Sequence, residues 1–376
     1  MSWTKKIMLT IVFVSIGIVW LAWEKQSFAL LLLASALLSS ALSYFVRRFR
    51  AASIPVTVVF FCLSIAELAL PFITSAVDNK PVFHDPESGY MNGYIEQIEG
   101  FGYRPTPGVH SSRELTLDGE IIYDVTYTIG DDGYRMSRTG EPFIANVYGG
   151  SFTFGEGLND NETLVHYLWA DHGFNAKSVG IHGYGLQQAL YSIEHGLTTY
   201  EGFNILLTVP WHALRSACKP AYASGTPRYE VDGNYARLAG VCSVEGLFSR
   251  IARHSNIFKL VQKALYNEKN QITDEDIELY LAIVRTIARH THESNSRLVI
   301  AYIRATEERM QFTGWSNESL LEELKAISDI LVDVTLSDEQ ETLDRRYYIH
   351  ELDQHPNAEA NRERAQLIIQ SISNAR

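Results

Sequence analysis

Two separated stretches of the sequence carry side chains that together could perform acyl chemistry. The first, "YGGSFTFGEG" (Tyr148–Gly157), places Ser151 directly after two glycines. The second, "LDQHPN" near the C-terminus, places Asp353 two residues before His355. A serine hydroxyl becomes a nucleophile when a histidine takes its proton, and an aspartate holds that histidine in the correct tautomer. Ser151, His355 and Asp353 are therefore a candidate catalytic triad.

The glycine-rich stretch around Ser151 departs from two other patterns. A phosphate-binding P-loop reads G-x-x-x-x-G-K-[ST], and no lysine follows these glycines. A G-x-S-x-G elbow needs a glycine two residues after the serine, where this chain has Thr153. In the plainest alternative the glycines only bend a loop. We favour a serine at the end of a strand that is activated by the distant His355.

The elements around these residues alternate between short apolar runs and longer helical patterns. Strands are expected at "FIANVYGG", "FNAKSVGIHGYG", "FNILLTVPW", "SRLVIAYIRA" and "ILVDVTL". Helices are expected at "TLVHYLWADHG", "LQQALYSIEHGL", "TDEDIELYLAIVRTIARHTHE" and "SLLEELKAISDI". This alternation predicts an α/β domain with a parallel sheet covered by helices on both faces. Ligands bind such sheets at the carboxyl ends of the strands, where the glycine turns lie.

The chain before this α/β region, from residue 78, and one stretch within it read less regularly. Residues 78–140 are polar and turn-rich, and "RELTLDG" and "EIIYDVTYTIG" predict two strands around an Asp118-Gly119 turn. We expect a β-rich lead-in there that packs against the catalytic domain, which would cover 141–376. Residues 217–240 look irregular and are expected to form an excursion near the site.

Three apolar segments open the chain and predict an N-terminal bundle of three transmembrane helices over residues 1–77. They are Ile7–Trp23, Ser27–Val46 and Ala51–Val77. Crossing a hydrocarbon core takes roughly 17–25 helical residues, which each segment can supply. A cleaved signal peptide is the alternative for the first segment. The two that follow would keep the protein in the membrane either way.

Basic residues predict the orientation of this bundle, because Lys and Arg concentrate on the cytoplasmic side. Lys5, Lys6 and Arg47–Arg50 should be cytoplasmic, which places the chain after Val77 outside. The predicted location is therefore the bacterial inner membrane, with a periplasmic catalytic domain. Glu67 is costly in lipid and should face a partner helix or a protein cavity.

Charge and cysteine usage narrow the partners and the compartment. The formal net charge is −12 without a long basic run, which argues against nucleic-acid binding. Cys62 lies in the third apolar segment and is expected to pack there. Cys218 and Cys242 would lie in an oxidising compartment, and we expect a disulfide between them. Histidines and cysteines form no cluster typical of a zinc site, so no metal is expected.

From "YGGSFTFGEGLNDNETL" onward the chain resembles the SGNH (GDSL-type) hydrolases, roughly over 145–376. Ser151 takes the position of the nucleophile in the first block of that family. "SVGIHGYGLQQAL" is similar to the second block, whose glycine N–H helps to form the oxyanion hole; Gly183 is the best match. "LDQHPNAEANRERA" is similar to the last block, with Asp353 and His355. The resemblance implies a three-layer α/β/α, flavodoxin-like fold with a five-stranded parallel sheet, ester or acyl chemistry, and no cofactor.

The sequence departs from the family pattern at two positions. Gly150 stands where the first block usually has Asp, a version familiar in the family. The third block usually supplies an oxyanion Asn, but the corresponding strand end reads "LLTVPWHALRSA". His212 is the expected replacement, with Arg215 one helical turn beyond it; a structural role for His212 stays the alternative. His182 is expected to line the site, and with Arg215 to contact substrate.

These observations favour a membrane-anchored serine esterase that removes acyl groups, most simply acetyl, from a cell-envelope polysaccharide or a lipid-linked glycan. One alternative is an O-acyltransferase that uses the same triad with a sugar hydroxyl as acceptor. Another is a non-catalytic glycan-binding or assembly subunit of the same fold. The expected partners are an acylated glycan, membrane lipid, and a membrane polysaccharide-assembly or acyl-donor protein.

Overall fold

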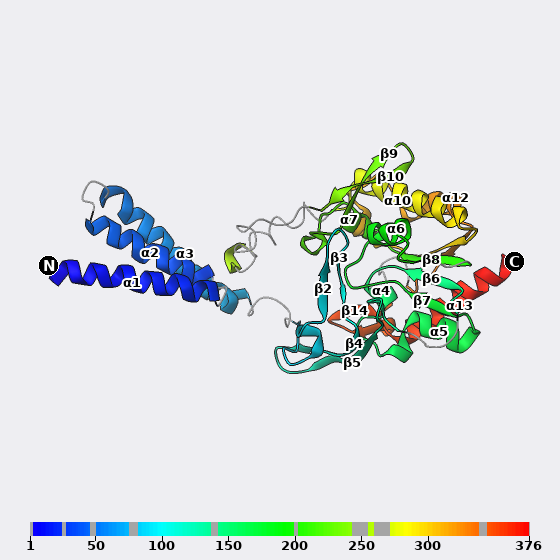
Figure 1. Cartoon of the computed structure of the whole chain (residues 1–376), viewed down its shortest axis with the longest axis horizontal. Coiled ribbons are helices and arrows are strands. Elements are labelled where there is room, and N and C mark those ends of the chain that lie inside the picture. The colour runs from blue at the N-terminus through cyan, green and yellow to red at the C-terminus, as the bar shows by residue number, and fades with distance from the viewer. Residues whose placement is uncertain are drawn as a thin grey trace. The chain divides into compact units, whose positions relative to one another are not determined.

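The chain divides into two compact units, one of residues 1–81 and 245–269 and one of residues 82–244 and 270–376 (Figure 1). The domain boundaries predicted at 77–78 and 140–141 lie outside the described residues. The computed structural model describes residues 3–24, 28–45, 50–74, 82–136, 142–198, 202–242, 255–258, 271–337 and 344–375.

The first unit contains three helices in the three apolar segments of the sequence. They are α1 (Trp3–Glu24), α2 (Phe28–Phe45) and α3 (Arg50–Thr74), and α2 packs against both of the others. Over the part of the chain that the structure describes, none of the helices combines the length and apolar character needed to cross a membrane. Arg47 and Arg48, on which the predicted orientation partly rests, lie outside the described residues.

Glu67 on α3 is buried and binds a segment from much later in the chain. Its carboxylate accepts hydrogen bonds from Oγ of Ser255 and from N–H of Ile257, each at 3.0 Å, and from N–H of Asn256. Residues 256–258 form a single helical turn whose N-terminal amides face this carboxylate. A buried carboxylate needs such donors, because an unpaired charge is expensive to desolvate. Within the first unit, Glu67 therefore caps this turn.

The second unit is built on one parallel sheet of five strands, as the alternation in the sequence predicts. The strands are β6 (Ala145–Tyr148), β7 (Ala176–Ser178), β8 (Phe203–Thr208), β11 (Arg297–Tyr302) and β12 (Ile330–Asp333). Their spatial order is β7-β6-β8-β11-β12, which is the flavodoxin-like order. After β6 the chain forms β7 on one side of that strand and then β8 on its other side. In sheets of this kind, ligands bind outside the carboxyl ends of the two strands at which the order reverses, here β6 and β8.

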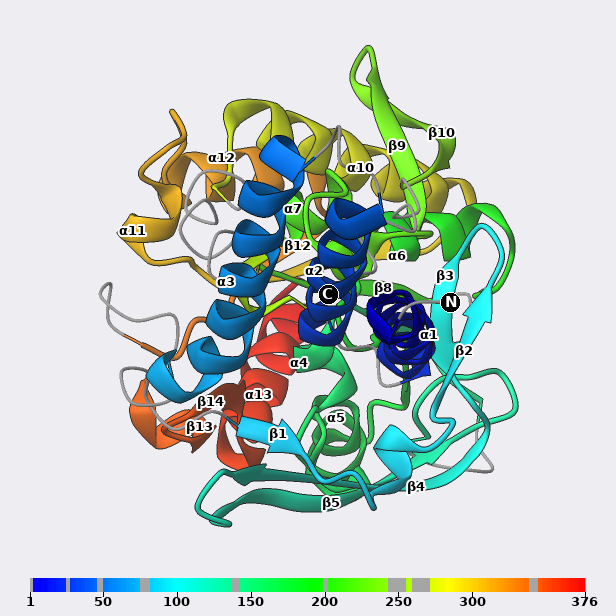
Figure 2. The same ribbon diagram turned by 90° about the vertical axis from the view of Figure 1, so that its left-hand side faces the viewer.

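Helices cover both faces of this sheet (Figure 2). On one face lie α5 (Leu164–His172) and α13 (Ala358–Asn374), and on the other α6 (Leu186–Glu194), α10 (Asp274–Glu293) and α12 (Asn317–Ile327). Along β8, Ile205 and Leu207 pack into the apolar core beneath α5 and α13, whereas Leu206 packs into the core beneath α6, α10 and α12. Successive residues of a strand point to opposite faces of the sheet. The structure is thus a mixed α/β fold of three layers.

The remaining elements lie outside the parallel sheet. An antiparallel sheet contains β1 (Val82–His84), β4 (Gly108–Thr116) and β5 (Ile121–Ile129); two hairpins are β2 (Ile95–Ile98) with β3 (Gly102–Pro105), and β13 (Tyr348–His350) with β14 (Asp353–Pro356). The short helices are α4 (Ser151–Phe154), α7 (His212–Ser216) and α11 (Glu307–Met310), with helical turns at Gly89–Met91, Asp160–Glu162, Ala221–Ala223 and Arg345–Tyr347. β4 and β5 are the two strands predicted around the Asp118-Gly119 turn.

The prediction of an irregular excursion over 217–240 was wrong for most of that stretch. Strands β9 (Pro227–Asp232) and β10 (Tyr235–Val241) form an antiparallel hairpin. Gly233 occupies the tight turn with a φ of 62°, which makes "DGN" the turn signal that was overlooked. Cys218 and Cys242 flank this hairpin and form a disulfide with a Cα–Cα separation of 5.5 Å, a usual value for such bonds.

We expect the Cys218–Cys242 disulfide to stabilise the second unit by about 3 kcal/mol, because it closes a loop of moderate length in the unfolded chain. Thiol titration of the denatured, unreduced protein should detect Cys62 alone. The double variant Cys218→Ser/Cys242→Ser should melt at a lower temperature than Cys62→Ser, which is the matched control. Three titratable thiols in protein isolated without reductant would contradict the bond.

Candidate active site

The turn that carries Ser151 has no room for side chains before the serine. Ser151 is the first residue of α4, directly after β6 and its two glycines. A Cβ at Gly149 would lie 2.1 Å from Oγ1 of Thr153 and 2.8 Å from the carbonyl oxygen of Leu207. A Cβ at Gly150 would lie 2.6 Å from a guanidinium nitrogen of Arg215. The two glycines are thus required by space, and they bring Ser151 to the end of β6 beside β8.

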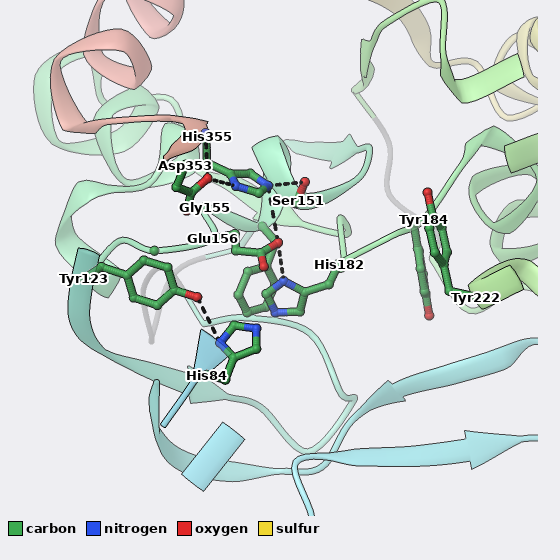
Figure 3. A network of polar contacts seen from close by, with 12 residues as sticks. His84, Tyr123, Ser151, Gly155, Glu156, His182, Tyr184, Tyr222, Asp353 and His355 are labelled. Atoms are coloured by element: carbon green, nitrogen blue, oxygen red, sulfur yellow. Dashed lines mark hydrogen bonds and ion pairs between the residues drawn. The ribbon is translucent and has the colours of Figure 1, made fainter. Parts of the chain in front are cut away.

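His355 and Asp353 lie beside Ser151 in hydrogen-bonding geometry (Figure 3). Nε2 of His355 is 2.9 Å from Oγ of Ser151, and Nδ1 of His355 is 2.5 Å from Oδ1 of Asp353. The same carboxylate oxygen accepts the backbone N–H of His355 at 3.0 Å. One side of the imidazole therefore faces the serine hydroxyl and the other a buried carboxylate.

The position of His355 is fixed by the strand and the helix on either side of it. Asp353 and His355 lie on β14, which pairs with β13. Asn357 then caps α13 by accepting the N–H of Ala360 at 3.1 Å, and its amide donates to the carbonyl oxygen of Arg346 at 2.8 Å. This N-cap stops the strand two residues after the histidine and sets the direction of the helix.

His212 lies on the far side of the serine turn, at the start of α7. Its Nδ1 is 3.2 Å from Oγ1 of Thr208, which is itself 3.1 Å from the hydroxyl of Tyr280. Its Nε2 lies 3.4 Å from the place that a Cβ on Gly150 would take. Burial, together with the charge of Arg215, lowers the pKa of His212 well below its usual value. The imidazole is therefore neutral and faces the turn that holds Ser151.

Arg215, predicted to bind substrate, is occupied by contacts within the protein. Its Nη1 donates to the carbonyl oxygen of Tyr184 at 2.7 Å, and its Nε donates to the hydroxyl of Tyr222 at 3.2 Å. Arg215 thereby ties the loop after β7 to α7, next to Gly150. The same loop contains Gly183, whose φ of 71° and close approach to the Tyr103 hydroxyl leave no space for a side chain. Its oxyanion role stays a prediction.

His182, predicted to line the site, is buried and is held by residues from two other regions. Its Nε2 is 2.9 Å from the hydroxyl of Tyr94, in the lead-in region, and its carbonyl oxygen accepts the hydroxyl of Tyr103 at 2.6 Å. Its Nδ1 is 2.8 Å from Oε2 of Glu156. The ring of Phe154 lies against the imidazole, with 4.0 Å between ring centres.

Glu156 is the site residue that the sequence analysis missed. It is largely buried, and its Oε2 is 3.5 Å from Nε2 of His355 as well as in contact with His182. Burial would raise the pKa of Glu156, but the charges of His182 and His355 outweigh it and lower that pKa. The available signal was a carboxylate between two glycines, Gly155 and Gly157, only a few residues after the candidate nucleophile.

The charges around His355 favour its protonated form. Burial lowers the pKa of His355, but Glu156 and then the hydrogen bond to Asp353 raise it, to about 9. Glu114 on β4 faces the same group: burial, then Asp353 and Glu156, raises its pKa to about 7. Within the described residues no group of His, Cys, Asp and Glu has the arrangement of a metal site.

Comparison with known proteins gave matches among solved structures, whereas no protein-family profile and no curated protein matches the sequence. A protein from Desulfitobacterium hafniense, assigned to the G-D-S-L family as lipolytic, is 12% identical over 62% of this chain and 99% of its own, with a TM-score of 0.34.

Two further structures are similar to the same degree. A protein from Slackia heliotrinireducens, assigned as an SGNH hydrolase, is 10% identical over 62% of this chain and 100% of its own, with a TM-score of 0.32. A carbohydrate esterase family 2 enzyme with a carbohydrate-binding domain, from Corynascus thermopiles (Myceliophthora fergusii), is 11% identical over 71% of this chain and 77% of its own, also with a TM-score of 0.32. At these low values, the assignment of residues rests on the geometry of the site itself.

Proposed function

We propose that this protein is a serine ester hydrolase of the SGNH type. The observation that supports this most directly is the pair of contacts made by His355, which is 2.9 Å from Ser151 Oγ through Nε2 and 2.5 Å from Asp353 through Nδ1. Ser151 Oγ attacks the ester carbonyl while His355 takes its proton, then passes that proton to the leaving alcohol. Water, activated by the same histidine, releases the acyl group and restores the serine.

The oxyanion formed in this reaction needs donors on the other side of the serine. The backbone N–H groups of Ser151 and Gly183 and the Nε2–H of His212 are the proposed set. A neutral imidazole carries one ring N–H proton, and the hydrogen bond between Thr208 and Nδ1 of His212 determines which ring nitrogen holds it. If Tyr280 donates to Thr208 Oγ1, the threonine hydroxyl donates to Nδ1 of His212, and the proton is on Nε2. His212 would then supply the hydrogen bond that Asn supplies in the family.

The proposed substrate is an acyl ester, most simply an acetyl ester, on a cell-envelope polysaccharide or a lipid-linked glycan. This rests on the predicted location and on the family resemblance. Release of free acetate from an acetylated glycan without any added acceptor is expected for the hydrolase. Product that forms only when a sugar hydroxyl is supplied would instead identify an O-acyltransferase, with a membrane protein as the acyl donor.

Attachment to the inner membrane by the three N-terminal helices is part of the same proposal. Its support is the apolar sequence of residues 1–77 together with large apolar side chains that α1 and α3 expose. Examples are Trp20, which is 68% exposed, and Leu68, which is 59% exposed. Many large apolar side chains exposed on one set of helices are typical of a surface that contacts lipid or another protein.

An alkaline phosphatase reporter fused after Gly140 should be active, because the predicted orientation puts this residue in the periplasm. Two fusions are the matched controls. A fusion after Gln26, which the same orientation places outside, should be active, and a fusion after Arg50, which it places inside, should be inactive. An inactive reporter after Gly140, with an active cytoplasmic reporter at the same point, would disprove the orientation.

Ser151→Ala should reduce hydrolysis of a small acyl ester by about 10³-fold or more, with the fold intact, because the hydroxyl is needed for chemistry and not for packing. The full-length chain should also lose its labelling by a fluorophosphonate probe. Ser373→Ala, an exposed serine on α13, is the control and should label normally. A wild-type chain that is folded but does not label would favour the non-catalytic subunit.

His212→Ala should lower turnover by about 10²–10³-fold, the usual cost of removing one oxyanion donor. His212→Asn should recover much of this loss, because asparagine restores a neutral N–H donor at the position. Steady-state rates and melting temperatures of both variants would be compared. If both variants lose activity to the same extent and both also lose stability to the same extent, His212 has a structural role.

A further inference from the structure

Glu156 approaches the one nitrogen that has to take the serine proton. Its Oε2 lies 3.5 Å from Nε2 of His355, while the same Nε2 lies 2.9 Å from Ser151 Oγ (Figure 3). In a serine triad the aspartate stabilises the imidazolium from the opposite nitrogen, Nδ1. Here, His355 has a carboxylate on each side, Asp353 at Nδ1 and Glu156 at Nε2.

The carboxylate of Glu156 is held in this place from several directions. Gly155 and Gly157 flank it with φ angles of 79° and 73°, so the chain turns sharply on both sides of the residue. Nδ1 of His182 binds Oε2 at 2.8 Å, and Nε2 of His182 is in turn 2.9 Å from the buried hydroxyl of Tyr94. These contacts hold the carboxylate of Glu156 beside His355.

We propose that Glu156 is a positioning residue of the active site, which holds the protonated form of His355 by presenting a fixed carboxylate to Nε2 and thereby sets the pH above which Ser151 becomes a nucleophile. This inference rests on the proposed function, since it assumes that His355 is the base for Ser151. His182 and Tyr94 take part indirectly, because they fix the carboxylate.

The physical reason is that an opposite charge at this distance favours the charged form of its neighbour. The charge of Glu156 raises the pKa of His355, as do the hydrogen bond and charge of Asp353 and the charge of Glu114, and together they outweigh burial and bring it to about 9. His84 and His182 face Glu156 from the other side and favour its ionised form. Only neutral imidazole can accept the serine proton, so the free protein holds much of its base inactive at neutral pH.

The test is the rate at which a fluorophosphonate probe labels the full-length chain between about pH 6 and pH 10. This readout needs no knowledge of the natural substrate. For the wild-type protein the rate should rise with pH around an apparent pKa well above the ordinary histidine value. Glu156→Gln, which keeps the shape and removes the charge, should shift the rise to lower pH by about one unit or more.

The two profiles should cross. At pH 7 the variant should label faster, by about tenfold for a shift of one unit, because more of its imidazole is neutral. At high pH it should label more slowly than the wild type, since a weaker base activates the serine less well. Glu230→Gln on β9 changes the net charge equally and is ion-paired with Arg228, away from these contacts; it should follow the wild-type curve.

A Glu156→Gln profile that is lower at every pH and unshifted would overturn the proposal and leave Glu156 a purely structural residue. If this variant does not fold, the wild-type chain still provides a test. The imidazole NMR signal that disappears in His355→Gln should titrate well above the ordinary histidine value, and titration at or below that value would contradict the inference. Absence of labelling at every pH would count against the proposed function, while the NMR titration would still test the role of Glu156.

Discussion

The close packing of the backbone at the end of β6 is the constraint on which the rest of the site depends. Neither Gly149 nor Gly150 could carry a Cβ without meeting Thr153, the carbonyl oxygen of Leu207 or the guanidinium of Arg215. The absence of side chains lets the turn after β6 contact the ends of its neighbours. As a result, loops that follow three different strands meet at Ser151, and the nucleophile lies where the strand order reverses.

Charge is the second constraint, because the site buries more carboxylates than a triad needs. Asp353 and Glu156 lie on opposite sides of His355, and Glu156 also binds His182. Burial of a carboxylate is costly unless it is paired and hydrogen-bonded, so each histidine stabilises the acid beside it. This mutual stabilisation ties the protonation of the base to residues outside the triad. Glu114, whose pKa is raised to about 7 by burial and by Asp353 and Glu156, faces the same group.

Much of the fold could be predicted because its strands and helices follow from the local pattern of apolar and polar residues. Buried parallel strands read as short apolar runs, and the five that were predicted form the sheet. The hairpin around Gly233 was missed although its turn residues were visible and apolar and polar residues alternate along β9, because the register shift between Leu238 and Gly240 interrupts that pattern in β10. Glu156 was missed for a different reason. A carboxylate acquires a chemical role from its neighbours in space, and His182 and His355 reach it from distant parts of the chain.

The lead-in region shows how far such a site extends beyond its motifs. It was predicted to pack against the catalytic domain without forming a catalytic module of its own, and the described residues from 82 onward group with the sheet in one compact unit. Phe101 and Tyr134 from this region belong to the same apolar core as α6 and α10. Tyr94 and Tyr103 bind His182, which binds Glu156, which lies against the base. The position of a charge beside His355 therefore depends on residues that no catalytic motif contains.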